Sequence, residues 1–261
     1  MTPQIFNTIK KVYHYTTFDK LEKILDSMSF LFSKLIGMND FTEREKILYF
    51  EDIGKDNEQL SNIIVEKYKT VGQISLSQDS KQSKGYSINS LWGHYANSGE
   101  GCCLVFEKNR LITEADKKGY LYSSVKYNNG NSDFCIPKKV NSAEEVEKYF
   151  RKNWKALFYN KTKDWKYEQE YRILDLSFKL EPQYLSIKNS LIGVIFHSNC
   201  FDPVWDSPRI NNFIKKLKSI KKVGLSYEYS NMFRGKKGYV LKDGDGNEWN
   251  EESNYSHELD I

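Results

Sequence analysis

The order of strand-like and helix-like segments along the chain limits its possible folds more than any other feature. The run 191–197 is the most strand-like, and 12–15, 73–77, 101–107 and 169–174 also favour strands. Helical patterns lie between them at irregular intervals. A doubly wound parallel sheet requires regular alternation of strands and helices, which this order lacks. The sequence therefore predicts an α+β fold.

Capping residues mark the start of two helices. Thr17 is a suitable N-cap for a helix over 18–26, and Ser142 with Glu145 matches a capping box ahead of a helix over 143–159. The remaining expected elements are helices over 41–70 (broken near Gly54), 91–96 and 208–218 and strands over 30–33, 122–127, 222–229 and 238–242.

Composition and charge suggest one globular domain over 1–261. The chain is 39% hydrophobic and 15% aromatic, which excludes wholesale disorder, and no repeat or Pro-rich boundary divides it. The net charge of +4 is uneven, with a basic segment at 209–237 and an acidic tail at 242–261. These parts could bind a polyanion or screen one another. A solvated amphipathic helix beside a polar tail is the favoured interpretation.

Cysteine usage and hydropathy indicate a cytoplasmic protein. The four Cys lack CxxC spacing, and Cys102 and Cys103 occupy an apolar run typical of a buried strand. No apolar run approaches the ~20 residues that span a bilayer, and the N-terminus lacks a signal-peptide pattern, so no membrane partner is expected. Four dispersed His residues argue against a metal site.

Two carboxylates and a guanidinium recur at alternate positions in one β-favouring stretch. Glu168 and Glu170 would share a face of a strand, and Arg172 would continue that face. Ion pairing across a solvated strand is the simplest interpretation. A polar site is the alternative, and it gains weight from residues elsewhere in the chain.

Other polar and aromatic residues could complete such a site. His14 and Thr16 end the first expected strand, and Tyr95 lies in the short helix 91–96. A His can bind sugar hydroxyls, a Tyr can stack on a flat heteroaromatic ring, and a carboxylate can stabilise an oxocarbenium-like centre. Nicotinamide leaves NAD as a neutral molecule, so no general acid is needed. The set fits cleavage of the nicotinamide–ribose bond, with NAD as co-substrate.

The chain also resembles a known family of bacterial proteins. The resemblance covers roughly residues 10–200 and rests on five stretches: 13–16 (Tyr-His-Tyr-Thr), 38–43 (Met-Asn-Asp-Phe-Thr-Glu), 75–77 (Ser-Leu-Ser), 91–96 (Leu-Trp-Gly-His-Tyr-Ala) and 165–172. This widespread family is labelled a domain of unknown function and is related to abortive-infection proteins. It is grouped with the ADP-ribosyltransferase superfamily. The resemblance implies a split mixed β-sheet core with flanking helices.

The resemblance also implies roles for individual residues. His14 would contact the adenosine ribose of NAD, Thr16 the nicotinamide amide, and Tyr95 would stack on the ring, with Tyr15 or Tyr86 as alternatives. Glu170 would be the catalytic carboxylate. Glu168 would position or deprotonate the acceptor. A His-type first motif with a Glu-x-Glu third motif combines two branches of the superfamily, so the motifs leave the acceptor open.

Three functions are compatible with this pattern. The first is an NAD-dependent ADP-ribosyltransferase that acts on a nucleic-acid or protein acceptor, as a bacterial toxin or phage-defence effector controlled by an antitoxin or regulatory protein. The second is an NAD glycohydrolase, in which water is the acceptor. The third is a non-enzymatic sensor or interaction module. In that case Glu168 and Glu170 would form salt bridges with Arg172 or a nearby Lys and would not face an open cleft.

Overall fold

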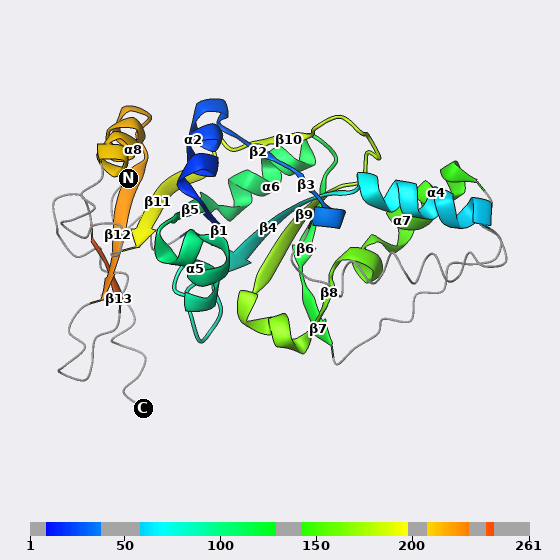
Figure 1. The fold of residues 1–261 in the computed structure, drawn as a ribbon, viewed down its shortest axis with the longest axis horizontal. Helices are drawn as coiled ribbons and strands as arrows, with labels where there is room; N and C mark the ends of the chain where they lie inside the picture. The colour runs from blue at the N-terminus through cyan, green and yellow to red at the C-terminus, as the bar shows by residue number, and fades with distance from the viewer. Residues whose placement is uncertain (1–8, 38–57, 129–141, 198–207, 230–238, 243–261) are drawn as a thin grey trace. The chain divides into compact units, whose positions relative to one another are not determined.

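The chain forms two compact units (Figure 1). The computed structural model describes residues 9–37, 58–128, 142–197, 208–229 and 239–242. Unit 1 comprises Met1–Met28, Ser77–Leu111 and Ile187–Ile261, and unit 2 comprises Ser29–Leu76 and Ile112–Ser186. The single domain expected from the sequence stays a prediction.

Unit 1 contains a mixed sheet in which five strands are adjacent in the order β13-β12-β11-β5-β1. Their bounds, in this order, are Tyr239–Lys242, Val223–Tyr229, Leu191–His197, Cys102–Glu107 and Lys11–Thr16. β5 runs antiparallel to both β1 and β11, whereas β11 and β12 are parallel. A parallel pair needs a crossover, and α8 (Pro208–Ser219) provides it.

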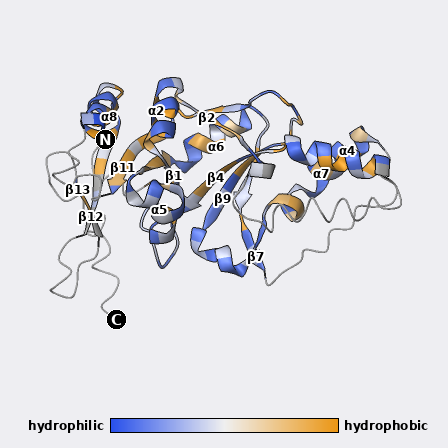
Figure 2. Cartoon of the chain, in the orientation of Figure 1, coloured by the Kyte–Doolittle hydropathy of each residue, from blue (hydrophilic) through white to orange (hydrophobic). Residues whose placement is uncertain are grey.

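Two helices cover one face of this sheet. α2 (Phe18–Ser27) follows β1 directly, and Leu21, Ile24 and Leu25 form its buried stripe. The ring of Phe18 lies 5.6 Å from that of Phe213 in α8. α8 is amphipathic, with hydrophobic residues buried and basic residues on its other sides (Figure 2). Together the two helices shield the apolar strands from water.

An aromatic cluster covers the opposite face of β1 and β11. α5 (Asn89–Tyr95) inserts Trp92, whose ring contacts Tyr15 at 5.1 Å, His197 at 5.3 Å and Tyr227 at 5.8 Å between centroids. The indole Nε1 donates a hydrogen bond to the Tyr86 carbonyl at 2.8 Å. We call Trp92 and these four partners the aromatic cluster.

Unit 2 is built around β9 (Glu170–Asp175), which lies between β4 (Gly72–Gln78) and β6 (Leu121–Ser124). The last two residues of β4 fall in unit 1 and pair with β1. The shorter strand pairs are β3 (Ser33–Lys34) with β4, β2 (Ser29–Leu31) with β10 (Tyr184–Ser186), and β7 (Lys126–Asn128) with β8 (Asn160–Thr162). The β7–β8 pair is parallel.

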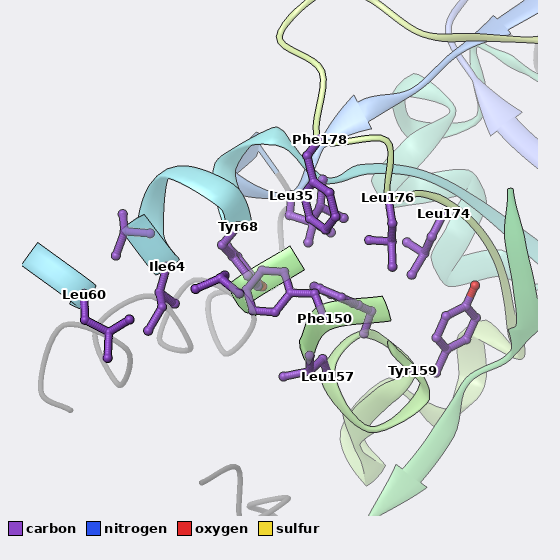
Figure 3. Close-up of a cluster of buried hydrophobic side chains, with 14 of the residues drawn as sticks. Leu35, Leu60, Ile64, Tyr68, Phe150, Leu157, Tyr159, Leu174, Leu176 and Phe178 are labelled. Carbon is purple, nitrogen blue, oxygen red and sulfur yellow. The ribbon is translucent and has the colours of Figure 1, made fainter. Parts of the chain in front are cut away.

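The hydrophobic core of unit 2 lies between two helices and β9. α4 (Glu58–Thr70) and α7 (Ala143–Phe158) supply Ile64, Tyr68 and Phe150, which pack near Leu174 of β9 (Figure 3). Ser142 caps α7 as expected, because its Oγ accepts a hydrogen bond from the Glu145 N–H at 3.2 Å. This core places the end of α7 beside β9.

Most of the expected elements are confirmed within a few residues. The chain is a mixed α/β structure with a mixed multi-stranded sheet, whereas the split sheet of the ADP-ribosyltransferase type stays a prediction. Two expected strands are wrong as single elements: 122–127 is divided between β6 and β7, and 30–33 is divided between β2 and β3. α6 (Lys108–Asp116), η1 (Leu35–Gly37) and η3 (Asn97–Gly99) were not expected. The expectations for 38–57, 230–238 and 243–261 lie outside the described residues.

Candidate functional site

Four charged side chains of unit 2 form a buried ion cluster. Lys161 Nζ lies 2.7 Å from Glu168 Oε2 and 3.0 Å from Glu170 Oε2. Arg172 forms a bidentate ion pair with Glu170, in which Nε donates to Oε1 at 2.7 Å and Nη2 donates to Oε2 at 2.9 Å. All four residues are less than 10% exposed. Two cations and two anions therefore compensate one another inside the protein.

The cluster is held by the backbone around it. Arg172 Nη1 donates to the Phe158 carbonyl at the end of α7 at 2.6 Å, and the hydroxyl of Tyr159 donates to the Arg172 carbonyl at 3.2 Å. The Glu170 N–H donates to the hydroxyl of Tyr127 at 2.8 Å. These contacts fix the guanidinium and the start of β9, so the carboxylate of Glu170 has a defined orientation.

β4 supplies two further donors to Glu170. Gln73 Nε2 lies 3.4 Å from Glu170 Oε1, and the Ser75 hydroxyl also hydrogen-bonds this carboxylate. Burial raises the pKa of Glu170, but the charges of Arg172 and Lys161 and the hydrogen bonds outweigh burial and lower this pKa to about 2. Glu170 is consequently ionised throughout the physiological pH range.

The depressed pKa predicts how stability changes in acid. Because the pKa of Glu170 falls from an ordinary 4.5 to about 2 on folding, its ionisation stabilises the fold above pH 4.5. This contribution, roughly 3 kcal/mol, should be lost as the pH falls from 4.5 to 2. Urea unfolding of the wild type and of Glu170→Gln across this range measures it, since the variant lacks the titrating group.

The exposed residue Glu144 provides the matched control. It pairs with Lys148 on the surface of α7, so Glu144→Gln should keep nearly the wild-type pH dependence. If Glu170→Gln lost stability in acid as steeply as the wild type, other carboxyl groups would be the cause of the acid sensitivity.

The placement of Glu168 differs from the expectation. Glu168 is the last residue of a 3-10 helix, η4 (Lys163–Glu168), and β9 begins only at Glu170. Gln169 between them has a left-handed backbone with φ of 50°, which redirects the chain. The two carboxylates are therefore not neighbours on one strand face, although both contact Lys161. The expected shared face of Glu170 and Arg172 is confirmed.

The residues expected to bind NAD lie in unit 1. β1 carries His14, Tyr15 and Thr16, and Tyr95 is the last residue of α5, which packs against β1. Because side chains alternate along a strand, His14 and Thr16 lie on the face opposite Tyr15. The Tyr15 hydroxyl donates to the Gly85 carbonyl at 2.8 Å, and its ring packs on Trp92. Tyr15 is thus engaged in the aromatic cluster.

Thr16 carries an unsatisfied polar atom. Its Oγ1 is buried, because Thr16 is only 2% exposed, and it has no hydrogen-bond partner among the described residues. A buried hydroxyl without a partner is costly, and a ligand group could satisfy it. His14 is partly exposed, so the end of β1 combines an imidazole accessible to water with this hydroxyl.

The six predicted site residues are divided between the units. His14, Tyr15, Thr16 and Tyr95 belong to unit 1, and Glu168 and Glu170 belong to unit 2. Their convergence on one NAD molecule stays a prediction. Three residues around Glu170 were missed, namely Lys161, Gln73 and Ser75. Of these, Gln73 and Ser75 lay in the expected strand 73–77, and no chemistry was assigned to either.

These features define a mixed α/β protein with a buried, charge-balanced cluster beside the start of a strand. Residues 91–173 match the family described as "Protein of unknown function (DUF2971)". The matched region contains residues 91–95 of α5, with Tyr95 among them, and the ion cluster. No curated protein and no solved structure matches the chain. None of the described helices is long and apolar enough to cross a membrane.

Proposed function

We propose that this chain is an NAD-dependent ADP-ribosyltransferase in which Glu170 is the catalytic carboxylate. The observation that supports this most is the state of Glu170, whose carboxylate is ionised and held in one orientation by Arg172, Lys161 and Ser75. A glycosidic bond that breaks with oxocarbenium character needs a fixed negative charge close to the reacting carbon. The orphan hydroxyl of Thr16 is the second supporting observation.

The proposed reaction assigns one task to each residue. Glu170 accepts a hydrogen bond from the 2′-hydroxyl of the nicotinamide ribose and stabilises the developing positive charge. The bond between the ribose C1 and the nicotinamide nitrogen breaks, and its electron pair leaves with neutral nicotinamide. Thr16 donates a hydrogen bond from its hydroxyl to the nicotinamide carboxamide, His14 holds the adenosine ribose, and Tyr95 stacks on the ring. The acceptor atom bonds to C1 and loses its proton to Glu168.

The same arrangement accommodates different acceptors. A nucleic-acid or protein group would make the chain a transferase, and water would make it an NAD glycohydrolase. Modification of a macromolecule or depletion of NAD would both suit a bacterial toxin or phage-defence effector, which an antitoxin or regulatory protein would have to restrain. The abortive-infection relationship implied by the resemblance is part of this proposal.

One observation favours a second candidate, a non-enzymatic interaction module. Both oxygens of Glu170 already contact Arg172, Oε2 also contacts Lys161, and the residue is only 3% exposed. A carboxylate with this many partners has little capacity left for a ribose hydroxyl. In this candidate function, the four charges stabilise unit 2 and bind no substrate.

Labelled NAD distinguishes the two candidates. Incubation of the full chain with NAD labelled in its ADP-ribose part, together with protein, RNA and DNA pools, should transfer the label to one pool. Glu170→Gln should reduce the transfer by roughly 100-fold or more, because it removes the charge that stabilises the transition state. Thin-layer separation of free ADP-ribose and nicotinamide detects hydrolysis in the same samples.

A matched variant separates catalysis from stability. Tyr159→Phe removes the hydroxyl that binds the carbonyl groups of Leu121 and Arg172, so it weakens the same region without touching a carboxylate. It should retain the transfer activity. Wild-type activity in Glu170→Gln would refute the catalytic assignment. Lack of NAD binding by the wild type in calorimetry at millimolar ligand would refute the NAD site and favour the interaction module.

A further inference from the structure

The basic segment expected at 209–237 is neutralised only in part where the structure describes it. Arg209 pairs with Asp19 at 2.5 Å and with Glu22 at 3.5 Å, and Lys216 pairs with Asp26. These three acids belong to α2, which packs beside α8. The basic residues of α8 that face α2 are therefore paired with acids of the same protein and do not form a free basic surface.

A second basic surface, which includes Lys221 and Lys222 of this segment, forms at one end of the sheet of unit 1. The register pairs Lys11 with Glu107 and Leu191 with Phe106, so the start of β1, the end of β5 and the start of β11 lie at the same end. β12 is parallel to β11 and begins at this end too. Six basic residues flank these strand ends, and we call them the basic edge: Lys10, Lys108, Arg110, Lys188, Lys221 and Lys222.

Contacts confirm that these residues are neighbours. The Lys108 N–H donates to the Lys10 carbonyl at 2.9 Å, and Lys222 Nζ lies 3.5 Å from the Lys188 carbonyl. Burial and then the charge of Lys10 lower the pKa of Lys108. Burial and then the charge of Arg110 lower the pKa of Lys222 in the same way. The positive charges therefore repel one another across the strand ends.

Little negative charge compensates this repulsion locally. Within the segments 9–11, 106–110, 187–191 and 219–223, Glu107 is the single acid, and it pairs with Arg110 at 2.7 Å. Asp79 directly follows β4, whose end pairs with the start of β1, and adds one more acid. α6 begins here, and its first turn contains no acidic residue, so the positive end of its dipole adds to the field. Like charges gathered in this way destabilise the free protein and favour an anionic partner.

The polar character of the edge indicates which anionic partner it fits. In the described part of the chain, the large hydrophobic residues that are exposed are Leu31, Leu180 and Tyr184, and all three belong to unit 2. A membrane-binding surface usually adds apolar side chains that enter the lipid. Asn109 and Asn189 are instead exposed among the basic residues. Amide and cationic groups together are typical of contacts to phosphate and sugar.

We propose that the basic edge of unit 1 binds the sugar–phosphate backbone of a nucleic acid without reading its sequence. This proposal does not depend on NAD chemistry, because it rests on charges of one unit alone. Lys and Arg side chains on phosphates release counterions, so the affinity must fall as salt rises. If the proposed transferase activity is confirmed as well, the edge would select nucleic acid as the acceptor.

Binding of short labelled RNA and DNA oligonucleotides, measured by fluorescence anisotropy without NAD, tests the proposal. The affinity should fall steeply between about 50 and 200 mM salt. The triple variant Lys10→Gln/Lys188→Gln/Lys221→Gln removes three exposed charges of the edge. It should bind roughly tenfold or more weakly, with a log–log salt slope shallower by about 2 for single strands.

A second triple variant controls for net charge. Lys20→Gln/Lys152→Gln/Lys163→Gln removes three exposed lysines outside the edge and should bind like the wild type. Equal weakening by both triple variants, or binding that does not respond to salt, would overturn the proposal. Tighter binding to vesicles of phosphatidylserine and phosphatidylcholine than to oligonucleotides would also overturn it and would identify a lipid surface as the partner.

Discussion

Replacement of Arg172 by Ala is expected to lower the free energy of unfolding by roughly 3–5 kcal/mol. Arg172 is fully buried, and its loss leaves Glu170 inside the protein with Lys161 as its remaining cation. The hydrogen bond to the Phe158 carbonyl at the end of α7 is lost as well. Urea denaturation at neutral pH, followed by circular dichroism, measures the change.

Two further variants show whether unpaired charge is the cause. Lys148→Ala breaks an exposed ion pair with Glu144 and should leave the urea midpoint unchanged. Replacement of all four cluster residues by apolar ones, Lys161→Met/Glu168→Leu/Glu170→Leu/Arg172→Met, should recover much of the stability lost in Arg172→Ala, because no charge remains buried. If Arg172→Ala cost less than about 1 kcal/mol, water would have to reach Glu170 in the variant.

Trp92→Ala is expected to have a comparable effect on unit 1. Trp92 is 3% exposed and is the centre of the aromatic cluster, so its removal leaves a cavity among Tyr15, His197 and Tyr227. Truncation of a buried Trp typically costs roughly 3–5 kcal/mol. Trp92→Phe retains much of the packing but leaves the Tyr86 carbonyl without the indole donor, which should cost roughly 1–2 kcal/mol.

The same truncation at a half-buried position provides the comparison. Trp165 in η4 is partly exposed and packs beside Tyr167, so Trp165→Ala should cost clearly less than Trp92→Ala. Thermal melts of both variants give the ranking. The opposite order would mean that the aromatic cluster of unit 1 repacks around the cavity.

The sequence predicted the strands of unit 1 because their apolar runs are unbroken. The expected ranges 101–107 and 191–197 agree with β5 and β11 within one residue. The range 122–127 failed because the chain changes partners after Val125. The Val125 N–H still donates to the Glu170 carbonyl of β9, whereas the Lys126 N–H donates to the Tyr159 carbonyl next to β8. α6 was missed because it follows β5 without a turn, so no local signal separates the two elements.

The candidate site was predicted only in part, because some of its interactions join residues close in the sequence and others join residues far apart. The pairing of Glu170 with Arg172 is local, since alternate residues of a strand share a face. The contact of Lys161 with both carboxylates depends on the turn at Gln169, where a non-glycine residue takes a left-handed backbone. Gln73 and Ser75 approach Glu170 through strand pairing across nearly a hundred residues, which no local pattern encodes.

The interleaved make-up of unit 1 has a consequence for protein synthesis. β1 emerges from the ribosome early, but β5 follows some ninety residues later, and its second neighbour β11 is translated only near residue 197. Until then β5 is the open edge strand of a partial sheet, and the residues of β5 are almost all apolar. Unit 1 is completed only after the segments of unit 2 have been translated, so nascent chains that stall between β5 and β11 should be prone to aggregation and should need chaperones.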